Sequence, residues 1–419
     1  MKTIKIDNKP SIQNIKEVNR VIIDIYFPIQ DNMTDAPKRN ILIRLLSNYQ
    51  DKYKDNYSFY NKMDSLYILK YSIRPLLFKE INYLRFSLIL PKENIIDEFN
   101  LEDALKFFKD SIYKPYIVNN EFSKDIFDIE KDYLVDNGSK YPNNIYDYVT
   151  ENYWDFIDKE EEIGLHHKHY MKLLKDTTSK DVYDYYVNNI LNNKNYFIYI
   201  YGNVKDKKSY LDRFNKVFKL DNNKKNYKVN FCKFRDNFKY THKEEITKYN
   251  QSVLCFNYAI KGMLEKELIL FDMFFDILDS KENALIFNEL RTKNNLIYSC
   301  KLNQKRHYGF FNILVYYNDI DYKDIINYVD IAIKSLYKKE VFNECKDRLV
   351  KSLKYTLLYK EDDPFDKVYS NIETKICNGI SFHKRINIVE NTTYEEFIKF
   401  LDKLTLVKTY LFIGGDNNA

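Results

Sequence analysis

Glycine is scarce in this chain, with 8 glycines among 419 residues. Phosphate-cradling loops depend on glycine, and the sequence contains no Walker-type motif, dinucleotide fingerprint or Gly-x-Ser-x-Gly. The five cysteines are widely spaced and form no Cys-x-x-Cys pair, so neither a structural zinc site nor a redox motif is indicated. These absences exclude the most recognisable nucleotide-binding and serine-hydrolase classes.

Long apolar runs and charge of one sign are also missing. No stretch approaches the roughly 18 apolar residues of a membrane helix, and residues 1–19 are polar, without the apolar core of a secretory signal. We therefore expect no membrane span, and scattered thiols are typical of a reducing cytoplasm. The 66 basic and 61 acidic residues nearly cancel to +5, so we expect no nucleic-acid partner.

Aromatic residues, in contrast, are abundant, with 39 tyrosines and 29 phenylalanines. They supply large apolar areas for packed cores, and a chain of 419 residues is too long for one ordinary core. Apolar, β-branched stretches such as 21–27 predict buried strands, and stretches such as 40–49 have the apolar spacing of helices. The composition predicts a globular protein of two or more domains.

The two halves of the chain end alike. A threonine-rich helix cap, an acidic helix and an apolar strand closed by glycine span residues 177–202, and the same order spans residues 392–414. This recurrence indicates an internal duplication. It predicts an α+β fold of two tandem homologous domains, each a mainly antiparallel sheet covered on one face by helices. The predicted division is an N-terminal domain at 1–204, a charged linker at 205–227 and a C-terminal domain at 228–419.

One segment offers the best candidate for chemistry. Residues 287–299 have the sequence Phe-Asn-Glu-Leu-Arg-Thr-Lys-Asn-Asn-Leu-Ile-Tyr-Ser. We expect a helix to end near Arg291, a short polar turn to follow, and a strand to begin near Leu296, so that Arg291 and Tyr298 flank the turn. Asn295 is one of the few residue types that tolerate a positive φ.

This segment and the tandem α+β halves resemble the insulinase/pitrilysin superfamily of zinc peptidases, in its two-repeat branch of mitochondrial-processing-peptidase-like subunits. Members similarly have Glu-Leu-Arg, a short turn and an apolar pair before Tyr-Ser, here Glu289–Arg291 and Leu296–Ser299. As an order of elements, the resemblance covers about residues 15–415. It implies that Arg291 holds substrate backbone or developing charge. It also implies that Tyr298 donates its hydroxyl to the tetrahedral oxyanion in a neighbouring subunit's active site.

The same resemblance implies a metal site that this sequence lacks. Family members hold zinc with two histidines of an inverted His-x-x-Glu-His on the first helix and a glutamate roughly seventy residues later, and the intervening glutamate activates the bound water. The matching stretch, 40–48, contains neither His nor Glu. Asp132 and Asp136 are possible replacements for the third ligand, but the sequence lacks the pair of histidines that they would complete. We therefore expect no metal or other cofactor in this chain, and zinc only in a partner subunit.

The implied function is that of a non-catalytic subunit in a heterodimeric zinc-dependent peptidase. The chain would supply Arg291 and Tyr298 to a homologous zinc-bearing subunit that cleaves peptides, and it would not be active alone; a homodimer is also possible. The alternative is an inactive peptidase homologue that binds peptides or holds an assembly together, for example in peptide maturation. A third interpretation is a self-sufficient hydrolase with an unrecognised site.

The histidine cluster of the sequence comprises His166, His167 and His169. His166 and His169 stand at i and i+3, so they would ligate a metal from one face of a helix. The acidic run at 160–162 and the following Gly164 favour a solvated loop instead, and no fixed third ligand is evident. A loop is therefore the expectation for this stretch.

Overall fold

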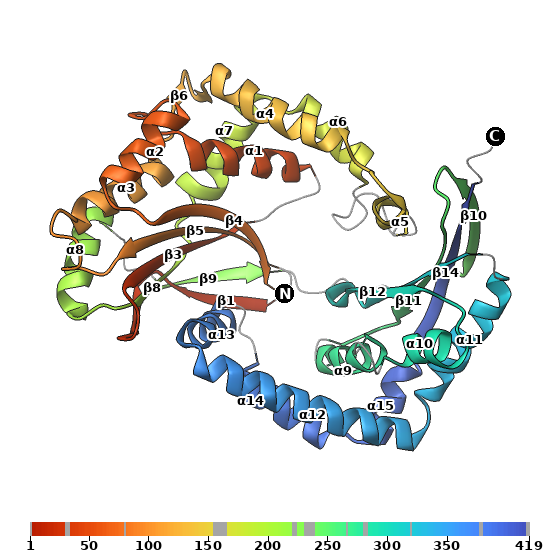
Figure 1. The fold of residues 1–419 in the computed structure, drawn as a ribbon. Coiled ribbons are helices and arrows are strands. Elements are labelled where there is room, and N and C mark those ends of the chain that lie inside the picture. The colour runs from red at the N-terminus through yellow and green to blue at the C-terminus, as the bar shows by residue number, and fades with distance from the viewer. Residues whose placement is uncertain are drawn as a thin grey trace. The chain divides into compact units, whose positions relative to one another are not determined.

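The computed structural model describes residues 2–29, 34–78, 81–153, 166–219, 224–229, 239–264, 267–279, 284–318, 321–376 and 380–415. The chain divides into two compact units, each built around a five-stranded sheet (Figure 1). Unit 1 comprises residues 1–141, 158–230 and 364–379, and unit 2 comprises residues 142–157, 231–363 and 380–419.

The sheet of unit 1 has the strand order β2-β8-β3-β5-β4. Its neighbours are antiparallel except that β2 runs parallel to β8 at one edge. The strands are β2 (Ser11–Asn14), β3 (Arg20–Ile29), β4 (Lys70–Phe78), β5 (Ile81–Pro91) and β8 (Phe197–Gly202). Two shorter ladders join β1 (Lys2–Asp7) to β9 (Lys224–Val229), and β6 (Ile117–Val118) to β7 (Glu121–Phe122).

Helices cover one face of this sheet (Figure 1). Because successive strand residues point to opposite faces, Ile23 and Ile25 of the central strand β3 enter the core beneath the helices. Leu42 and Leu45 of the first helix enter the same core. The helical segments are α1 (Asp35–Asn48), α2 (Asn56–Ser65), α3 (Leu101–Tyr113), α4 (Lys124–Ser139), α6 (His167–Asp176), α7 (Ser179–Tyr186), the π-helical η2 (Val187–Leu191) and α8 (Lys207–Phe218).

The sheet of unit 2 repeats this topology, in the order β10-β14-β11-β13-β12, again with one parallel pair at the edge formed by β10. Its strands are β10 (Thr241–Thr247), β11 (Ser252–Ile260), β12 (Ser299–Lys305), β13 (Phe310–Tyr317) and β14 (Leu404–Gly414). Its helical segments are α5 (Ile145–Asn152), α9 (Leu268–Asp279), α10 (Leu285–Phe287), the π-helical η5 (Asn288–Lys293), the 3-10 turn η6 (Arg306–Tyr308), α11 (Tyr322–Ser335), α12 (Lys339–Asp362), α14 (Phe382–Asn391) and α15 (Tyr394–Leu401).

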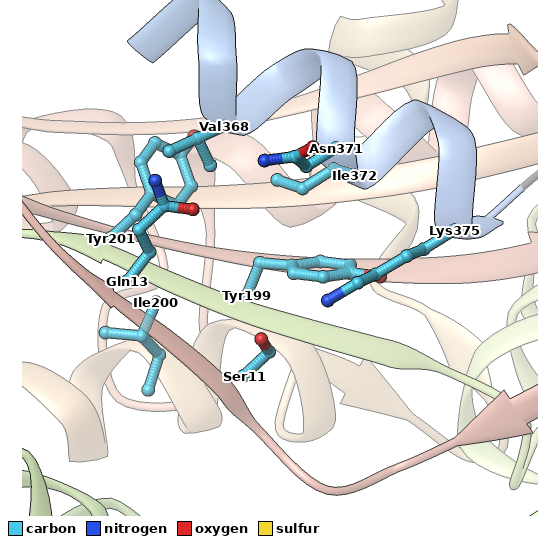
Figure 2. A pocket seen from close by; sticks show the side chains of 9 residues that line it. All are labelled: Ser11, Gln13, Tyr199, Ile200, Tyr201, Val368, Asn371, Ile372 and Lys375. Carbon is cyan, nitrogen blue, oxygen red and sulfur yellow. The ribbon is translucent and has the colours of Figure 1, made fainter. Parts of the chain in front are cut away.

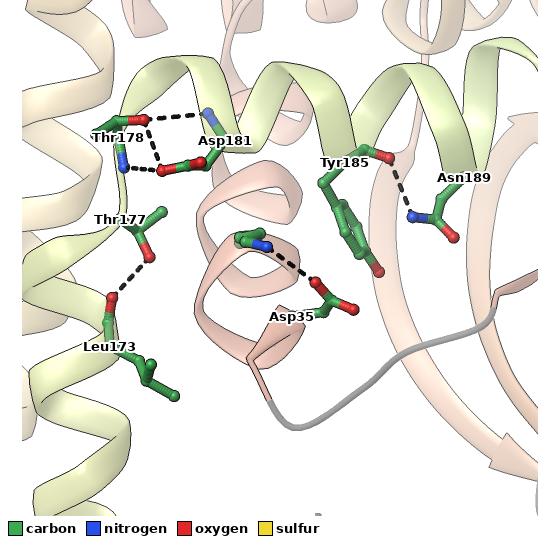
Figure 3. A network of polar contacts seen from close by, with 8 residues as sticks. Asp35, Leu173, Thr177, Thr178, Asp181, Tyr185 and Asn189 are labelled. Atoms are coloured by element: carbon green, nitrogen blue, oxygen red, sulfur yellow. Dashed lines mark hydrogen bonds and ion pairs between the residues drawn. The ribbon is translucent and has the colours of Figure 1, made fainter.

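The matching strand orders confirm the predicted duplication and the predicted α+β fold. In both halves, the helix before the closing strand begins with a capping box. The Thr178 hydroxyl accepts from the Asp181 N–H at 3.2 Å, and the Asp181 carboxylate accepts from the Thr178 N–H at 2.9 Å (Figure 3). Thr393 and Glu396 form the same pair at the start of α15.

Both closing strands end at a glycine that the backbone requires. Gly202 has a φ of +130°, which side chains rarely allow, and a Cβ there would lie 2.2 Å from the carbonyl oxygen of Arg20. A Cβ on Gly414 would lie 2.4 Å from the carbonyl oxygen of Asn250. The strand ends predicted at these two glycines are therefore confirmed.

The opposite face of the first sheet carries α13 (Pro364–Ile376), which comes from the second half of the chain but belongs to unit 1. Figure 2 shows Val368 and Ile372 of this helix above Tyr199 and Tyr201 of β8, around a small pocket. Apolar side chains of α13 thus bury aromatic rings that would otherwise face water.

A buried polar cluster fastens α13 to the sheet. Asp24 is fully buried, pairs with Arg85 at 2.9 Å and accepts from the Tyr201 hydroxyl at 2.7 Å. Arg85 also donates to the Tyr369 hydroxyl of α13 at 3.0 Å, and the Tyr369 and Tyr201 hydroxyls lie 3.1 Å apart. Burial and the charge of Asp24 raise the pKa of Tyr201 well above its ordinary value, so the phenol stays a neutral donor.

The two units do not follow a single cut in the sequence. Residues 207–218, inside the predicted linker, form α8, because Phe214 and Phe218 pack into the core of unit 1. In the other direction, α5 comes from the first half of the chain but belongs to unit 2, where Tyr148 donates to Glu245. The predicted boundaries are contiguous, whereas the compact units contain α5 and α13 from the opposite halves.

Candidate functional site

The segment at 287–299 joins a helical turn to an edge strand of the second sheet. The helix α10 continues into η5, which ends at Lys293 rather than near Arg291, and β12 begins at Ser299 rather than near Leu296. Within the described strands, β12 pairs only with β13. Among those strands its other edge has no ladder partner, and an unpaired strand edge is where an extended ligand can add.

The turn between η5 and β12 has a backbone fixed by two hydrogen bonds. Asn295 adopts a φ of 52°, the left-handed conformation expected of it. Its N–H donates to the Arg291 carbonyl at 3.0 Å, and the Leu296 N–H donates to the Leu290 carbonyl at 2.9 Å. Leu290 and Ile297 are buried on either side of the turn, so both ends are anchored in the core.

Arg291 spans this turn from its helical side. Its Nη1 donates to Asn295 Oδ1 at 3.0 Å and to the Ile297 carbonyl at 2.9 Å. These bonds hold the chain after the turn against the end of η5. Within the described part of the chain, the Nε and Nη2 groups of Arg291 make no hydrogen bond, so they are available to a ligand.

Tyr298 is the exposed aromatic residue of the segment, with 69% of its surface accessible. Its ring centroid lies 5.7 Å from the guanidinium carbon of Arg291, near the outer limit of cation–π attraction. The preceding residue, Ile297, is buried and hydrogen-bonded, so the backbone that carries Tyr298 is fixed while its phenol faces solvent. This arrangement suits a hydrogen-bond donor for a ligand.

The first half of the chain provides an internal comparison for Tyr298. Ahead of β4, which corresponds to β12, Tyr67 has a φ of 54°, Ile68 is buried and Leu69 is 58% exposed. A left-handed residue precedes the edge strand in both halves, one position closer to the strand in the first half, and the residue directly before the edge strand is exposed in both. Because Leu69 takes that position in the first half, the fold does not require a hydroxyl there.

Acidic side chains follow one face of α9, which contacts β12. Asp272 is held by Arg306, whose Nη1 donates to both carboxylate oxygens at 3.0 and 2.9 Å. Asp276 and Asp279 keep exposed surface, but partial desolvation by the surrounding protein raises the pKa of Asp276, and desolvation together with the charge of Asp276 raises that of Asp279 to about 6. Burial and the nearby charge of Asp279 also raise the pKa of Cys300 to about 12, so this thiol is a poor nucleophile at neutral pH.

In unit 1, the buried Glu130 of α4 accepts hydrogen bonds from three side chains, two on α1 and one on the residue that follows it. It pairs with Nε of Arg44, and its Oε1 accepts from Asn48 Nδ2 and from the Tyr49 hydroxyl, each at 3.0 Å. Arg44 and Asn48 lie one turn apart on α1, the spacing of the two histidines in the resembled zinc motif. These residues are not among those singled out from the sequence; the spacing of four between Arg44 and Asn48 is the signal in the sequence that points to them.

These residues do not fit a metal ion. Zinc binds imidazole, thiolate or carboxylate donors, whereas the guanidinium of Arg44 offers only N–H donors and a fixed positive charge. The expected stand-ins, Asp132 and Asp136, are exposed on α4, and Glu130 is the acid that meets α1. Over the described ranges, no group of three His, Cys, Asp or Glu side chains could hold a metal ion.

The histidine cluster supports the helices of unit 1. His167 begins α6, where the sequence favours a loop, because Leu174 of that helix is buried in the core. Its Nε2 lies 2.8 Å from the Gly138 carbonyl oxygen at the end of α4, and its ring centroid lies 4.6 Å from that of Tyr141. The earlier part of the predicted loop, 160–165, lies outside the described residues.

Residues 176–349 match the family model described as the Peptidase M16 inactive domain. A search of curated proteins gave no significant match. No helix in the described part of the chain combines the length and apolar character needed to cross a bilayer.

Several solved structures share the fold over almost the entire chain. A conserved protein from Enterococcus faecalis V583 is 15% identical, with 100% of this chain and 99% of that chain covered and a TM-score of 0.81. A protease from Helicobacter pylori is 11% identical, with coverage of 98% and 99% and a TM-score of 0.74. The peptidase M16 inactive domain from Pseudomonas fluorescens is 12% identical, with coverage of 99% and 98% and a TM-score of 0.72.

The duplicated fold places the chain among two-repeat α+β proteins with the architecture of these solved structures. The family match is more specific. Residues 176–349 match the inactive domain of the M16 peptidases, and the Pseudomonas fluorescens structure that shares the fold carries the same description. These findings confirm the resemblance to insulinase-like proteins, with a non-catalytic, peptidase-like domain over the matched residues.

Proposed function

We propose that this chain is the non-catalytic subunit of a zinc-dependent peptidase, in which Arg291 and Tyr298 complete the active site of a homologous zinc-bearing partner. The observation that carries this proposal is the exposed phenol of Tyr298 on a fixed backbone. The leucine at the corresponding place in the first half supports it, because the fold itself accepts an apolar residue there.

The chemistry of peptide cleavage gives each residue a role. Attack of water on a peptide carbonyl places negative charge on its oxygen, and the Tyr298 hydroxyl would donate to that oxygen. A donor that acts mainly on this transition-state charge is worth roughly 2.7–4 kcal/mol, or about 10²–10³ in kcat. Arg291 would position Tyr298 through its bonds to the turn and hold substrate carbonyls with its remaining N–H groups.

The substrate would be an extended peptide. The open edge of β12 presents backbone donors and acceptors directly after Tyr298, so a peptide that adds to this edge as a strand would run past the phenol. Strand addition reads backbone rather than sequence, which favours short or unfolded peptides of varied composition. We also propose a cytoplasmic location, which is supported by the free thiols of Cys255, Cys300 and Cys345.

A reconstitution experiment tests the proposal. The purified chain, its nearest homologue from the same organism that contains His-x-x-Glu-His, and an equimolar mixture are assayed on a fluorogenic peptide library, with and without a zinc chelator. We expect cleavage only in the mixture and its loss with chelator. Chelator-sensitive cleavage by this chain alone would contradict the assigned subunit role and would reveal a metal site of its own.

The alternative function, a peptide-binding or assembly protein, has one observation in its favour. In unit 1, the edge strand β4 also pairs on one side only within the described strands, and Leu69 and Leu77 are exposed at its two ends. A peptide bound there would pair with unit 1, whereas Tyr298 belongs to unit 2. Fluorescence polarisation with labelled peptides separates the two functions, because binding that is unchanged in Tyr298→Phe, with no cleavage in any mixture, favours the alternative.

A further inference from the structure

The contacts around Glu130 join the first helix of unit 1 to α4. We propose that the Arg44–Glu130 ion pair takes the structural place of the zinc that the resembled peptidases bind, and closes this position to cations. The inference concerns unit 1 alone and holds whether or not Tyr298 serves a partner.

The donors converge on one buried carboxylate. Glu130 is 2% exposed, and both of its oxygens are used, Oε2 by Arg44 and Oε1 by Asn48 and Tyr49. Arg44 and Asn48 are on α1, and Tyr49 directly follows this helix. Glu130 is on α4, 82 residues after Asn48 in the sequence. The cluster therefore links two helices in the way that a shared metal ion links its ligands.

The guanidinium of Arg44 also contacts an aromatic ring. The ring centroid of Tyr133, one turn after Glu130 on α4, lies 3.7 Å from the guanidinium carbon of Arg44. Asn48, in turn, accepts from the Tyr60 hydroxyl at 3.2 Å. Arg44 is thus enclosed between a carboxylate and an aromatic face, an arrangement that suits guanidinium better than a compact cation.

The charges around Glu130 disfavour the binding of a metal ion. The guanidinium stays positively charged at all physiological pH values, so a divalent cation near Glu130 would face a fixed positive charge and only one carboxylate. Tyr49 remains a neutral donor, because burial and the charge of Glu130 raise the pKa of its hydroxyl well above the ordinary value. In the resembled zinc motif, the catalytic glutamate directly precedes the second histidine. Ser47 is the residue at that place in this chain, directly before Asn48, and a serine hydroxyl is too weak a base to activate water.

A double-mutant cycle tests the structural role, with thermal unfolding of the full chain as the measurement. Arg44→Met leaves a buried carboxylate without its cation and should lower Tm by several degrees. Glu130→Gln keeps an acceptor for Asn48 and Tyr49, so its effect should be smaller. The double variant should be more stable than Arg44→Met, because the unpaired charge is gone. If the Tm changes of the two single variants simply add up in the double variant, the proposed coupling is wrong. Asp132→Asn, at an exposed neighbouring position on α4, is the matched control.

Zinc titration by calorimetry tests the exclusion of cations. The wild type and Glu130→Gln should take up the same amount of zinc, because Glu130 binds none. The variant Arg44→His/Asn48→His should bind one further zinc ion per chain, through two imidazoles and Glu130, and this ion should be lost when Glu130→Gln is added.

Zinc bound by the wild type and lost in Glu130→Gln would overturn the proposal. If the double-histidine variant folds and binds no more zinc than the wild type, the three positions do not form a ligand set, and the proposal is equally wrong. The wild-type comparison and the double-mutant cycle remain decisive even if the double-histidine variant does not fold.

Discussion

Arg291 donates a hydrogen bond of 2.9 Å to the carbonyl of Ile297, across a turn of six residues. This bond fixes the peptide unit from which Tyr298 projects, while the Tyr298 side chain itself stays exposed. The two residues that the sequence singles out therefore have separate structural positions. Arg291 is built into the turn, and Tyr298 is presented by it.

The first prediction concerns Arg291→Lys. Lysine keeps the charge, but its ammonium on a flexible stem lacks the rigid guanidinium plane that holds Nη1 within reach of both Asn295 and Ile297. We expect faster hydrogen exchange at the amides of 295–299 and a nearly unchanged Tm, because the turn lies at the surface. Lys293→Arg, at an exposed neighbour paired with Glu289, is the matched control and should leave exchange unchanged. Unaltered exchange in Arg291→Lys would show that these two bonds do not hold the turn.

The second prediction concerns Asn295, which has a φ of 52°. A β-branched residue is strained in this conformation, whereas glycine adopts it freely. Asn295→Val should lower the free energy of unfolding by roughly 1–2 kcal/mol, and Asn295→Gly should change it far less. Denaturant unfolding measures both variants. Equal losses in the two would mean that the side-chain contact with Arg291, and not the backbone conformation, determines the choice of residue.

The third prediction concerns the cluster that joins α13 to the first sheet. Tyr369→Phe removes the contacts of one hydroxyl with Arg85 and Tyr201, so it should cost about 1 kcal/mol of stability. Asp24→Asn leaves Arg85 without its buried partner and should cost about 3–5 kcal/mol. Denaturant unfolding compares both with Tyr355→Phe, at an exposed tyrosine of α12. A Tyr369→Phe variant as stable as this control would mean that the hydroxyl does not fasten the helix.

The fourth prediction is a pH dependence at Asp279. Partial desolvation and the charge of Asp276 raise the pKa of this carboxyl from 3.8 to about 6, so between these pH values the folded chain retains a proton there that the unfolded chain releases. The resulting stabilisation is complete below about pH 3.8 and is lost as the pH rises through about 6. Asp279→Asn should therefore raise Tm at pH 7.5 and leave it unchanged near pH 4.

Thermal unfolding across this pH range measures the effect at Asp279. Asp347→Asn, at an exposed aspartate of α12, controls for the loss of one negative charge from unit 2. A Tm difference that is the same at both ends of the range would contradict the raised pKa of Asp279.

Local patterns were sufficient to predict much of this molecule. The capping residues Thr178 and Thr393 mark the last helix of each half, and Gly202 and Gly414 mark the closing strands, because caps and strand ends depend on neighbours in sequence. The left-handed Asn295 follows from the same kind of short-range argument. The duplication, and with it the two sheets, can be predicted from these repeated signals.

Long-range pairing could not be predicted in this way. The exchange of α5 and α13 between the two units depends on contacts such as that of Arg85 with Tyr369, 284 residues apart. Glu130 likewise meets Arg44 through a fold that neither residue specifies locally, so exposed Asp132 and Asp136 were equally plausible from sequence alone. The helical spacing of Phe214 and Phe218 is a local signal of packing in the segment predicted as a linker, and α8 forms there.

The most direct test of the proposed function is the kcat of the reconstituted mixture with Tyr298→Phe in place of the wild-type chain. Phenylalanine keeps the ring and removes only the hydroxyl. We predict that kcat falls about 10²–10³-fold, while KM and complex formation with the zinc-bearing homologue stay nearly unchanged, and that Tyr355→Phe has no effect. An active mixture with the same kcat for Tyr298→Phe and the wild type would contradict the assignment of Tyr298 to the partner's transition state.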